Sequence, residues 1–212
     1  MQPTALLPLL WLIGSPPGSC TEPPRIASGV IAFHGSIDDK SDYSRSDIRE
    51  LAQKSGKPLP HAPLGFYIGS IGHDVMVRTE RQASPDGSRC DYLTTVTVRI
   101  SLVNRVIQIA NDVDAGGCKR NVVLNHYRKH AAADDRVLSQ YVQTVNKALR
   151  DAWPQMSGKL NPSGHPDEDG IREIAESVIN QASDDFKSIR ADAAAAVDSP
   201  SEVKSLMCSS KA

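Results

Sequence analysis

The feature that most constrains the fold is the long stretch from 120 to 152, whose apolar residues recur with the period of an α-helix. At about 100° per residue, the apolar side chains of this stretch fall in one stripe along the helix, which must be buried against another element. They are Val123, Tyr127, Ala131, Leu138, Tyr141, Val145 and Ala152. His130 and Asp134 fall within this stripe, and His126 lies at its edge. Polar residues at core-facing positions are the departures from pattern expected at functional sites. We therefore expect this helix to carry the site.

The remaining patterns predict an α+β fold. Residues alternate in polarity from Tyr92 to Leu102, which indicates a strand with one buried and one mostly polar face. Asn104-Arg105 permits a tight reversal into a further strand, and a second amphipathic helix is predicted from Ile171 to Val197. We expect a small, mostly antiparallel sheet packed on the long histidine-bearing helix, with the second long helix behind it. A single domain would cover residues 28–208.

The N-terminus predicts export. A short apolar run from Ala5 to Gly14 is followed by a Pro-rich segment that ends at Cys20, the layout of a secretory signal. Residues 1–20 are interpreted as a signal peptide, or as a lipoprotein signal in which an acylated Cys20 anchors the chain to a membrane. Residues 21–27 would be a linker. The alternative is an ordinary Pro-rich N-terminus without a targeting role.

The overall charge limits the classes of partner that we expect. The formal net charge is -1, so the chain lacks the basic character of a nucleic-acid-binding protein. We expect an exported protein of the periplasm or cell envelope whose partner is a peptide or another envelope protein. Contact with a membrane would come only through a lipid anchor at Cys20.

Four cysteines permit disulfides if the chain is exported. Cys90 begins the alternating strand and Cys118 begins the histidine helix, so a bridge between them would join sheet to helix. Cys20 and Cys208 would form a second bridge if Cys20 is not acylated, whereas acylation would leave Cys208 unpaired. Spacing alone does not choose between these arrangements.

His126 and His130 carry the strongest chemical signal. Two histidines four residues apart on one helix face supply two of the three protein ligands that a catalytic Zn²⁺ site uses. Asp134 is one candidate for the third, although it lies two turns from His126, and His165 and Glu168, in the loop before the second helix, are others. The alternative is a hydrogen-bonded histidine pair buried against the sheet. The segment 165–176 also partly matches a calcium loop, although acidic residues favour a helix N-terminus for other reasons.

The same region resembles a group of small exported bacterial proteins that are grouped with the zincin-type metallopeptidases. Their pattern is a cysteine, alternating strands, a Gly-Ser or Gly-Cys turn, and V-x-x-H-E-x-x-H-x-x-x-D followed by apolar residues. The corresponding residues here are Cys90, Val96 to Leu102, Gly117-Cys118, Val123, His126, His130, Asp134 and Leu138. The similarity covers roughly residues 60–208 and implies a zincin-like fold more strongly than it implies any activity. It implies metal-ligand roles for His126 and His130, with Asp134 as the acceptor that orients a ligand imidazole.

The departure from that family is Tyr127, which stands where the motif has its catalytic glutamate. The glutamate is the general base that takes a proton from the attacking water. Tyrosine titrates near 10, so at neutral pH it is a proton donor and a poor base. Losing a general base typically costs a factor of about 10²–10⁴ in rate. Tyr127 is still able to donate a hydrogen bond to a bound carbonyl, or it simply packs in the helix stripe.

Three functions stay open on this basis. The first is an exported, zincin-like protein that is catalytically impaired and binds Zn²⁺ or a peptide in the remnant cleft. The second is a structural or interaction protein of the cell envelope that uses the scaffold without metal. The third is an active zinc-dependent hydrolase that draws its base from elsewhere, for instance from Glu168 or Glu173.

Overall fold

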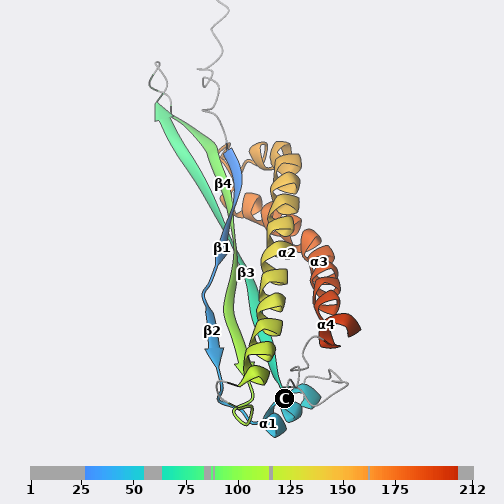
Figure 1. The fold of residues 1–212 in the computed structure, drawn as a ribbon. Helices are drawn as coiled ribbons and strands as arrows, with labels where there is room; N and C mark the ends of the chain where they lie inside the picture. Colours follow the sequence, from blue (N-terminus) through green and yellow to red (C-terminus); the bar gives the residue numbers. More distant parts are fainter. Residues whose placement is uncertain are drawn as a thin grey trace, which may run out of the picture.

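The computed structural model describes residues 27–54, 64–83, 87, 89–114, 117–161 and 163–204. These residues form a twisted sheet with two long helices on one of its faces (Figure 1). The elements follow the order β1 (Ala27–His34), β2 (Ile37–Lys40), α1 (Arg45–Lys54), β3 (Gly65–Ala83), β4 (Arg89–Ile109), α2 (Cys118–Ser157), α3 (Glu168–Val197) and α4 (Pro200–Lys204). The α+β class predicted from the sequence is confirmed.

The sheet is built around β4. On one side β4 pairs antiparallel with β3 along its whole length, from Ala83↔Arg89 to Gly65↔Ile109. On the other side β1 and then β2 pair with it in parallel. The expectation of a mostly antiparallel sheet is therefore wrong, because two of the three strand pairings are parallel. The chain turns back through α1 and again at the β3–β4 hairpin, so β1 and β2 run in the same direction as β4.

A bulge in β4 changes which of its alternating side chains face the core. The even-numbered residues from Val96 to Leu102 are fully buried, whereas beyond the bulge Arg105 and Ile107 occupy the buried positions. The change occurs at Asn104, whose φ is 53°, where the register with β3 shifts between Ile68 and Ser70. An extra residue in one strand moves the following side chains to the opposite face. The tight reversal expected at Asn104-Arg105 is therefore wrong, since β4 continues to Ile109.

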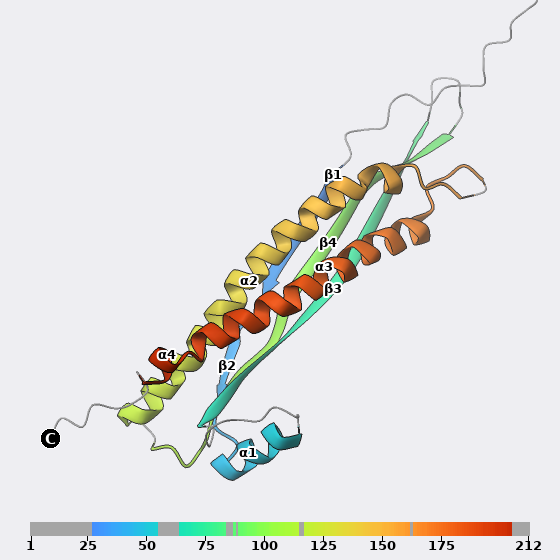
Figure 2. The same ribbon diagram turned by 90° about the vertical axis from the view of Figure 1, so that its right-hand side faces the viewer.

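The core lies between the sheet and the helices. Figure 2 shows α2 over β1 and β4, with α3 beside it over β3. The predicted stripe of α2 is buried at Val123, Ala131, Leu138, Tyr141 and Val145. Leu138, Tyr141 and Val145 meet the buried face of β4 and the apolar side of α3, which contributes Ile171, Ala175, Ile179, Ala182 and Phe186. Val123 packs in a second cluster, with Ile107 and Ile109 of β4 and Ile48 of α1. The long helix and its packing face are thus confirmed, and Gly158 caps its end.

Cys90 and Cys118 are both disulfide-bonded, but the bridge predicted between them is wrong. Cys90 is the second residue of β4, whereas Cys118 begins α2 beyond the other end of that strand. The strand has 21 residues, which at about 3.3 Å each span roughly 70 Å. The Cα atoms of a disulfide lie within about 7 Å of each other. Figure 1 accordingly shows the start of β4 and the start of α2 at opposite ends of the molecule.

Several predictions for the termini lie outside the described residues. They are the signal at 1–20, all of the linker except Ala27, and the pairing of Cys20 with Cys208. Among the described residues, no helix combines the length and the apolar character needed to span a membrane.

Candidate metal centre

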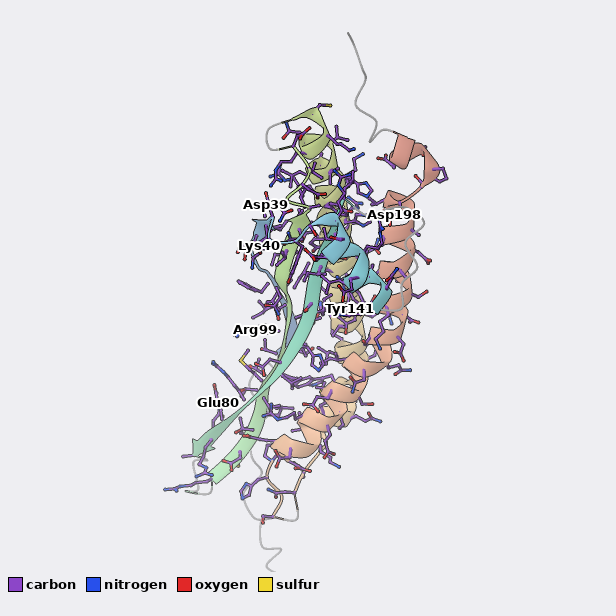
Figure 3. All side chains as sticks on the ribbon, turned by 90° about the horizontal axis from the view of Figure 1, so that it is seen from below. Asp39, Lys40, Glu80, Arg99, Tyr141 and Asp198 are labelled. Atoms are coloured by element: carbon purple, nitrogen blue, oxygen red, sulfur yellow. The ribbon has the colours of Figure 1, made fainter. Side chains whose placement is uncertain are left out.

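The two predicted ligands converge on a third residue that the sequence did not single out as a ligand. His126 and His130 lie one turn apart on α2, and Asp198 is the C-cap residue of α3. Oδ1 of Asp198 lies 3.2 Å from Nε2 of His126 and 3.0 Å from Nε2 of His130. One ligand atom from each residue lies within 4.8 Å of the others. Figure 3 marks Asp198 at the end of α3.

The centre has one buried and one open side. The side chains of His126 and His130 are 8% and 13% exposed, whereas that of Asp198 is 57% exposed. Burial, together with the neighbouring charge of His130, lowers the pKa of His126 more than the carboxylate of Asp198 raises it. A lowered pKa favours the neutral imidazole, which is the form that binds a metal ion.

One ring nitrogen of the centre lacks the hydrogen bond that usually orients a ligand imidazole. Nδ1 of His126 is buried and has no hydrogen-bond partner among the described residues. Metal-ligating histidines usually donate this second ring N–H to a carboxylate or carbonyl, and losing that contact typically costs about 10–100-fold in metal affinity. The residues therefore fit a metal ion in type and spacing, with weaker support for His126 than dedicated zinc sites provide.

Tyr127 is held by the sheet. Its hydroxyl donates a 2.5 Å hydrogen bond to the carbonyl of Gly65 in β3. Burial, and to a smaller extent the charge of Asp198, raises the pKa of Tyr127 above its usual value. A Cβ atom at Gly65 would lie 2.8 Å from the tyrosine ring, so the glycine allows this contact. A tyrosine with a raised pKa and an occupied hydroxyl is a poor candidate for proton transfer.

The carboxylate of Asp134 is bound by Arg190 and not by either imidazole. Arg190 of α3 donates to both of its oxygens, with Nε–Oδ1 and Nη2–Oδ2 distances of 2.8 Å and 2.6 Å. The same guanidinium donates to the carbonyl of Gly69 in β3. The role implied for Asp134, orienting a ligand imidazole, is replaced here by an ion pair that joins α2, α3 and β3.

The two loop residues predicted as candidates for the third ligand lie far from the histidines. His165 contacts Asp91 near the start of β4, and Glu168, which begins α3, accepts a hydrogen bond from Thr79. Asp198 follows the other end of the 30-residue α3, which at about 1.5 Å per residue is roughly 45 Å long. The acidic segment that resembled a calcium loop caps this helix, since Asp167 accepts a hydrogen bond from the backbone N–H of Gly170.

Sequence reasoning missed Asp198 as a ligand, although a signal for it existed. Two long helices joined by a short loop pack antiparallel, so residues at similar distances from the loop lie opposite each other. His130 precedes the end of α2 at Ser157 by about as many residues as Asp198 follows the start of α3 at Glu168. Reading the two helices as a hairpin would have placed Asp198 beside the histidines.

A cleft of about 450 Å³ adjoins the centre between β3, α2 and α3. Its lining includes His130, Tyr67, Asp134, Phe186 and Arg190. The centre is therefore next to a space that a small ligand or a peptide side chain could enter.

Comparison with known proteins gives no match to a protein-family model, a curated protein or a solved structure. The zincin resemblance accordingly rests on the motif residues alone.

Proposed function

We propose that this protein is exported and zincin-like, that it binds Zn²⁺ through His126, His130 and Asp198, and that it is impaired as a peptidase. The convergence of both Nε2 atoms on one carboxylate oxygen supports the metal site most directly. Two imidazoles from one helix turn and a carboxylate from another element match the ligand types of catalytic zinc sites. Because Asp198 is largely exposed, the open side of the centre would be accessible to a ligand.

The proposed loss of activity rests on Tyr127. A bound Zn²⁺ ion would supply Lewis acidity to a substrate carbonyl. The residue at the position of the motif glutamate cannot accept a proton at neutral pH, and its hydroxyl is already bonded to Gly65. Glu168 begins the far end of α3, so it does not replace the missing base. The geometry supports binding better than turnover.

One observation favours the second function, a non-catalytic envelope protein. Direct contacts of the two imidazoles with Asp198 join α2 to the end of α3. Lys129 and Glu202 add an ion pair between α2 and α4 beside them. In that case these contacts would serve to dock the last two helices on α2.

Zinc binding to the metal-stripped full chain separates the two functions. Isothermal titration with Zn²⁺ should give one equivalent for the wild type and no binding for a His126→Ala/His130→Ala variant. Asp198→Asn should weaken binding at least tenfold, because an amide is a poor ligand for zinc. His165→Ala is the matched control, since this exposed histidine lies at the other end of the molecule. If the wild type does not bind zinc, the proposal of a metal site is wrong and the non-catalytic envelope protein is the function that stands.

Substitutions at Tyr127 test the catalytic part. Tyr127→Phe removes the bond to Gly65 and should lower the free energy of unfolding by about 1 kcal/mol without changing zinc affinity. Tyr127→Glu restores the motif and should produce chelator-sensitive cleavage of peptides if the cleft is intact. Chelator-sensitive cleavage by the zinc-loaded wild type would show that the protein is an active hydrolase instead.

A further inference from the structure

The outer strands of the sheet differ in how they are covered. Three helix side chains donate hydrogen bonds to backbone carbonyls along β3. Tyr127 reaches Gly65, Arg190 reaches Gly69, and Arg172 reaches Val75. An outer strand of a sheet offers unpaired backbone groups to other chains unless something covers or interrupts it. The helices provide such cover for β3.

The opposite side of the sheet consists of β1 and β2, which meet β4 one after the other. β2 has the sequence Ile-Asp-Asp-Lys, and Figure 3 marks Asp39 and Lys40 on it. Charged side chains on an edge strand discourage pairing with another chain. β2 is therefore protected by its composition.

Among the described residues, β1 has neither form of protection, because α2 lies over its face without a side-chain hydrogen bond to its backbone and its own sequence lacks charged residues. Its sequence from Ala27 to His34 contains no Asp, Glu, Lys, Arg or Pro. Ile31 and Phe33 are 52% and 54% exposed although both are large and apolar. They pair with Arg99 and Ser101 of β4 and so lie on the sheet face opposite the helices. Among the described residues no strand pairs with β1 except β4.

The backbone of β1 fixes which groups point outward. The N–H of Gly35 donates to the carbonyl of Leu102 in β4, 2.8 Å away. Because backbone groups alternate in direction along a strand, the odd-numbered residues of β1 bond to β4. The N–H and C=O groups of Val30, Ala32 and His34 therefore point away from β4, where a further strand would pair.

We propose that β1 pairs antiparallel with the β1 strand of a second copy of this chain, about a two-fold axis through Ala32. In this register Ala32 of one copy bonds to Ala32 of the other, so the outward-pointing groups meet each other. Ile31 of one copy then lies directly opposite Phe33 of its partner, twice by symmetry. These are non-hydrogen-bonded pairs, in which facing side chains come closest, and an aromatic residue opposite a β-branched one is a favourable pair.

The sequence of β1 supports a second copy of this chain as its pairing partner. An isologous two-fold contact requires a surface that is complementary to itself. Shifting the axis to Ile31 or Phe33 would place glycine opposite one of the two large side chains, since Gly29 and Gly35 flank them. Only the axis at Ala32 pairs both large side chains with each other. No ionised acid or base within β1 opposes a copy of itself.

Light scattering coupled to size-exclusion chromatography on the full chain tests this arrangement. The wild type should have twice the 22.9 kDa mass of one chain. Ile31→Lys/Phe33→Lys should be monomeric, because like charges then face each other across the axis. Ile31→Lys/Phe33→Glu should be dimeric again, since each new lysine faces a new glutamate of the partner. Ile68→Lys is the matched control: Ile68 is 51% exposed but lies on β3, so the dimer should persist.

A backbone variant checks the same contact without changing charge. Ala32→Pro removes only an N–H that points away from β4, and a proline in that position is tolerated on edge strands. It should be monomeric with an unchanged circular dichroism spectrum. A monomeric wild type would overturn the proposal, and so would a dimer that survives both Ile31→Lys/Phe33→Lys and Ala32→Pro. Loss of the dimer in Ile68→Lys would also overturn it, because the contact would then lie on the sheet face.

Discussion

Arg190 holds Asp134 through two parallel hydrogen bonds, of 2.8 Å and 2.6 Å, and so joins α3 to α2. A third bond from the same guanidinium to the carbonyl of Gly69 adds β3. The side chain of Asp134 is only 9% exposed. A buried carboxylate that loses its partner is strongly destabilising, whereas exposed pairs contribute little.

Arg190→Ala should therefore lower the free energy of unfolding by about 3 kcal/mol, measured by urea denaturation. Arg190→Lys should recover only part of this loss, because an ammonium group cannot make two parallel bonds to a carboxylate. Lys187→Ala is the control, since Lys187 pairs with Asp184 on the exposed side of the same helix. A loss in Arg190→Ala no larger than in this control would show that the Asp134 contact does not stabilise the fold.

The sequence predicted the histidine pair of the site but not the contacts of Asp134 and Asp198, for a physical reason. A spacing of four on one helix is a local property, so His126 and His130 could be placed together from the pattern. The partner of Asp134 is 56 residues away, and nothing local distinguishes an aspartate bound to arginine from one bound to an imidazole. Asp198 likewise joins the histidines only through the packing of α3 against α2.

At Asn104 the backbone preference of the residue was predicted correctly, but the tight reversal expected from it does not form. Asparagine tolerates positive φ better than most residues, and Asn104 adopts a φ of 53°. A tight reversal uses such a residue, but so does a bulge within a continuous strand. The parallel partners β1 and β2 extend along β4 on both sides of Asn104, and this long-range pairing selects the bulge.

Substitution at Asn104 should follow its conformation. Asn104→Gly should leave the free energy of unfolding nearly unchanged, because glycine adopts positive φ without steric cost. Asn104→Val should lower it by about 1–2 kcal/mol, since a β-branched residue is disfavoured in the left-handed region. Thermal denaturation of the two variants against the wild type measures the difference. Equal stability of the two variants would mean that the backbone at this position is not left-handed.

The cysteines give a prediction that needs no substitution. Because Cys90 and Cys118 lie at opposite ends of β4, peptide mapping without reduction should recover them in two different disulfide-linked species. Each species should separate into two peptides on reduction. A single linked species that contains both cysteines would contradict the arrangement of β4 and α2. Here too the sequence located the cysteines correctly on their elements but gave no length for the strand between them.

The acid stability of the protein should depend on Asp135. This residue accepts hydrogen bonds from His34 at 2.8 Å and from the buried Arg105 at 2.9 Å. Burial raises the pKa of Asp135, but these hydrogen bonds and the charge of Arg105 outweigh it, so the pKa lies below its usual value. A carboxyl group with a lowered folded-state pKa binds protons more weakly in the folded than in the unfolded chain. Its stabilising effect is therefore present above an unfolded-state pKa of about 3.9 and is lost as the pH falls through the folded-state pKa.

Asp135→Asn should reduce the slope of unfolding free energy against pH between about pH 5 and pH 2, because the amide does not titrate. The amide oxygen keeps an acceptor for Arg105, so the variant should remain folded near neutral pH. Urea denaturation at a series of pH values measures both slopes. The wild type should lose more stability than the variant on acidification. The Asp47 and Asp91 carboxyls, whose pKa values are also lowered by hydrogen-bonding partners, should leave the variant with a residual slope. Identical slopes in the two proteins would show that Asp135 titrates alike in the folded and unfolded chains, and that its contacts with Arg105 and His34 do not persist in solution.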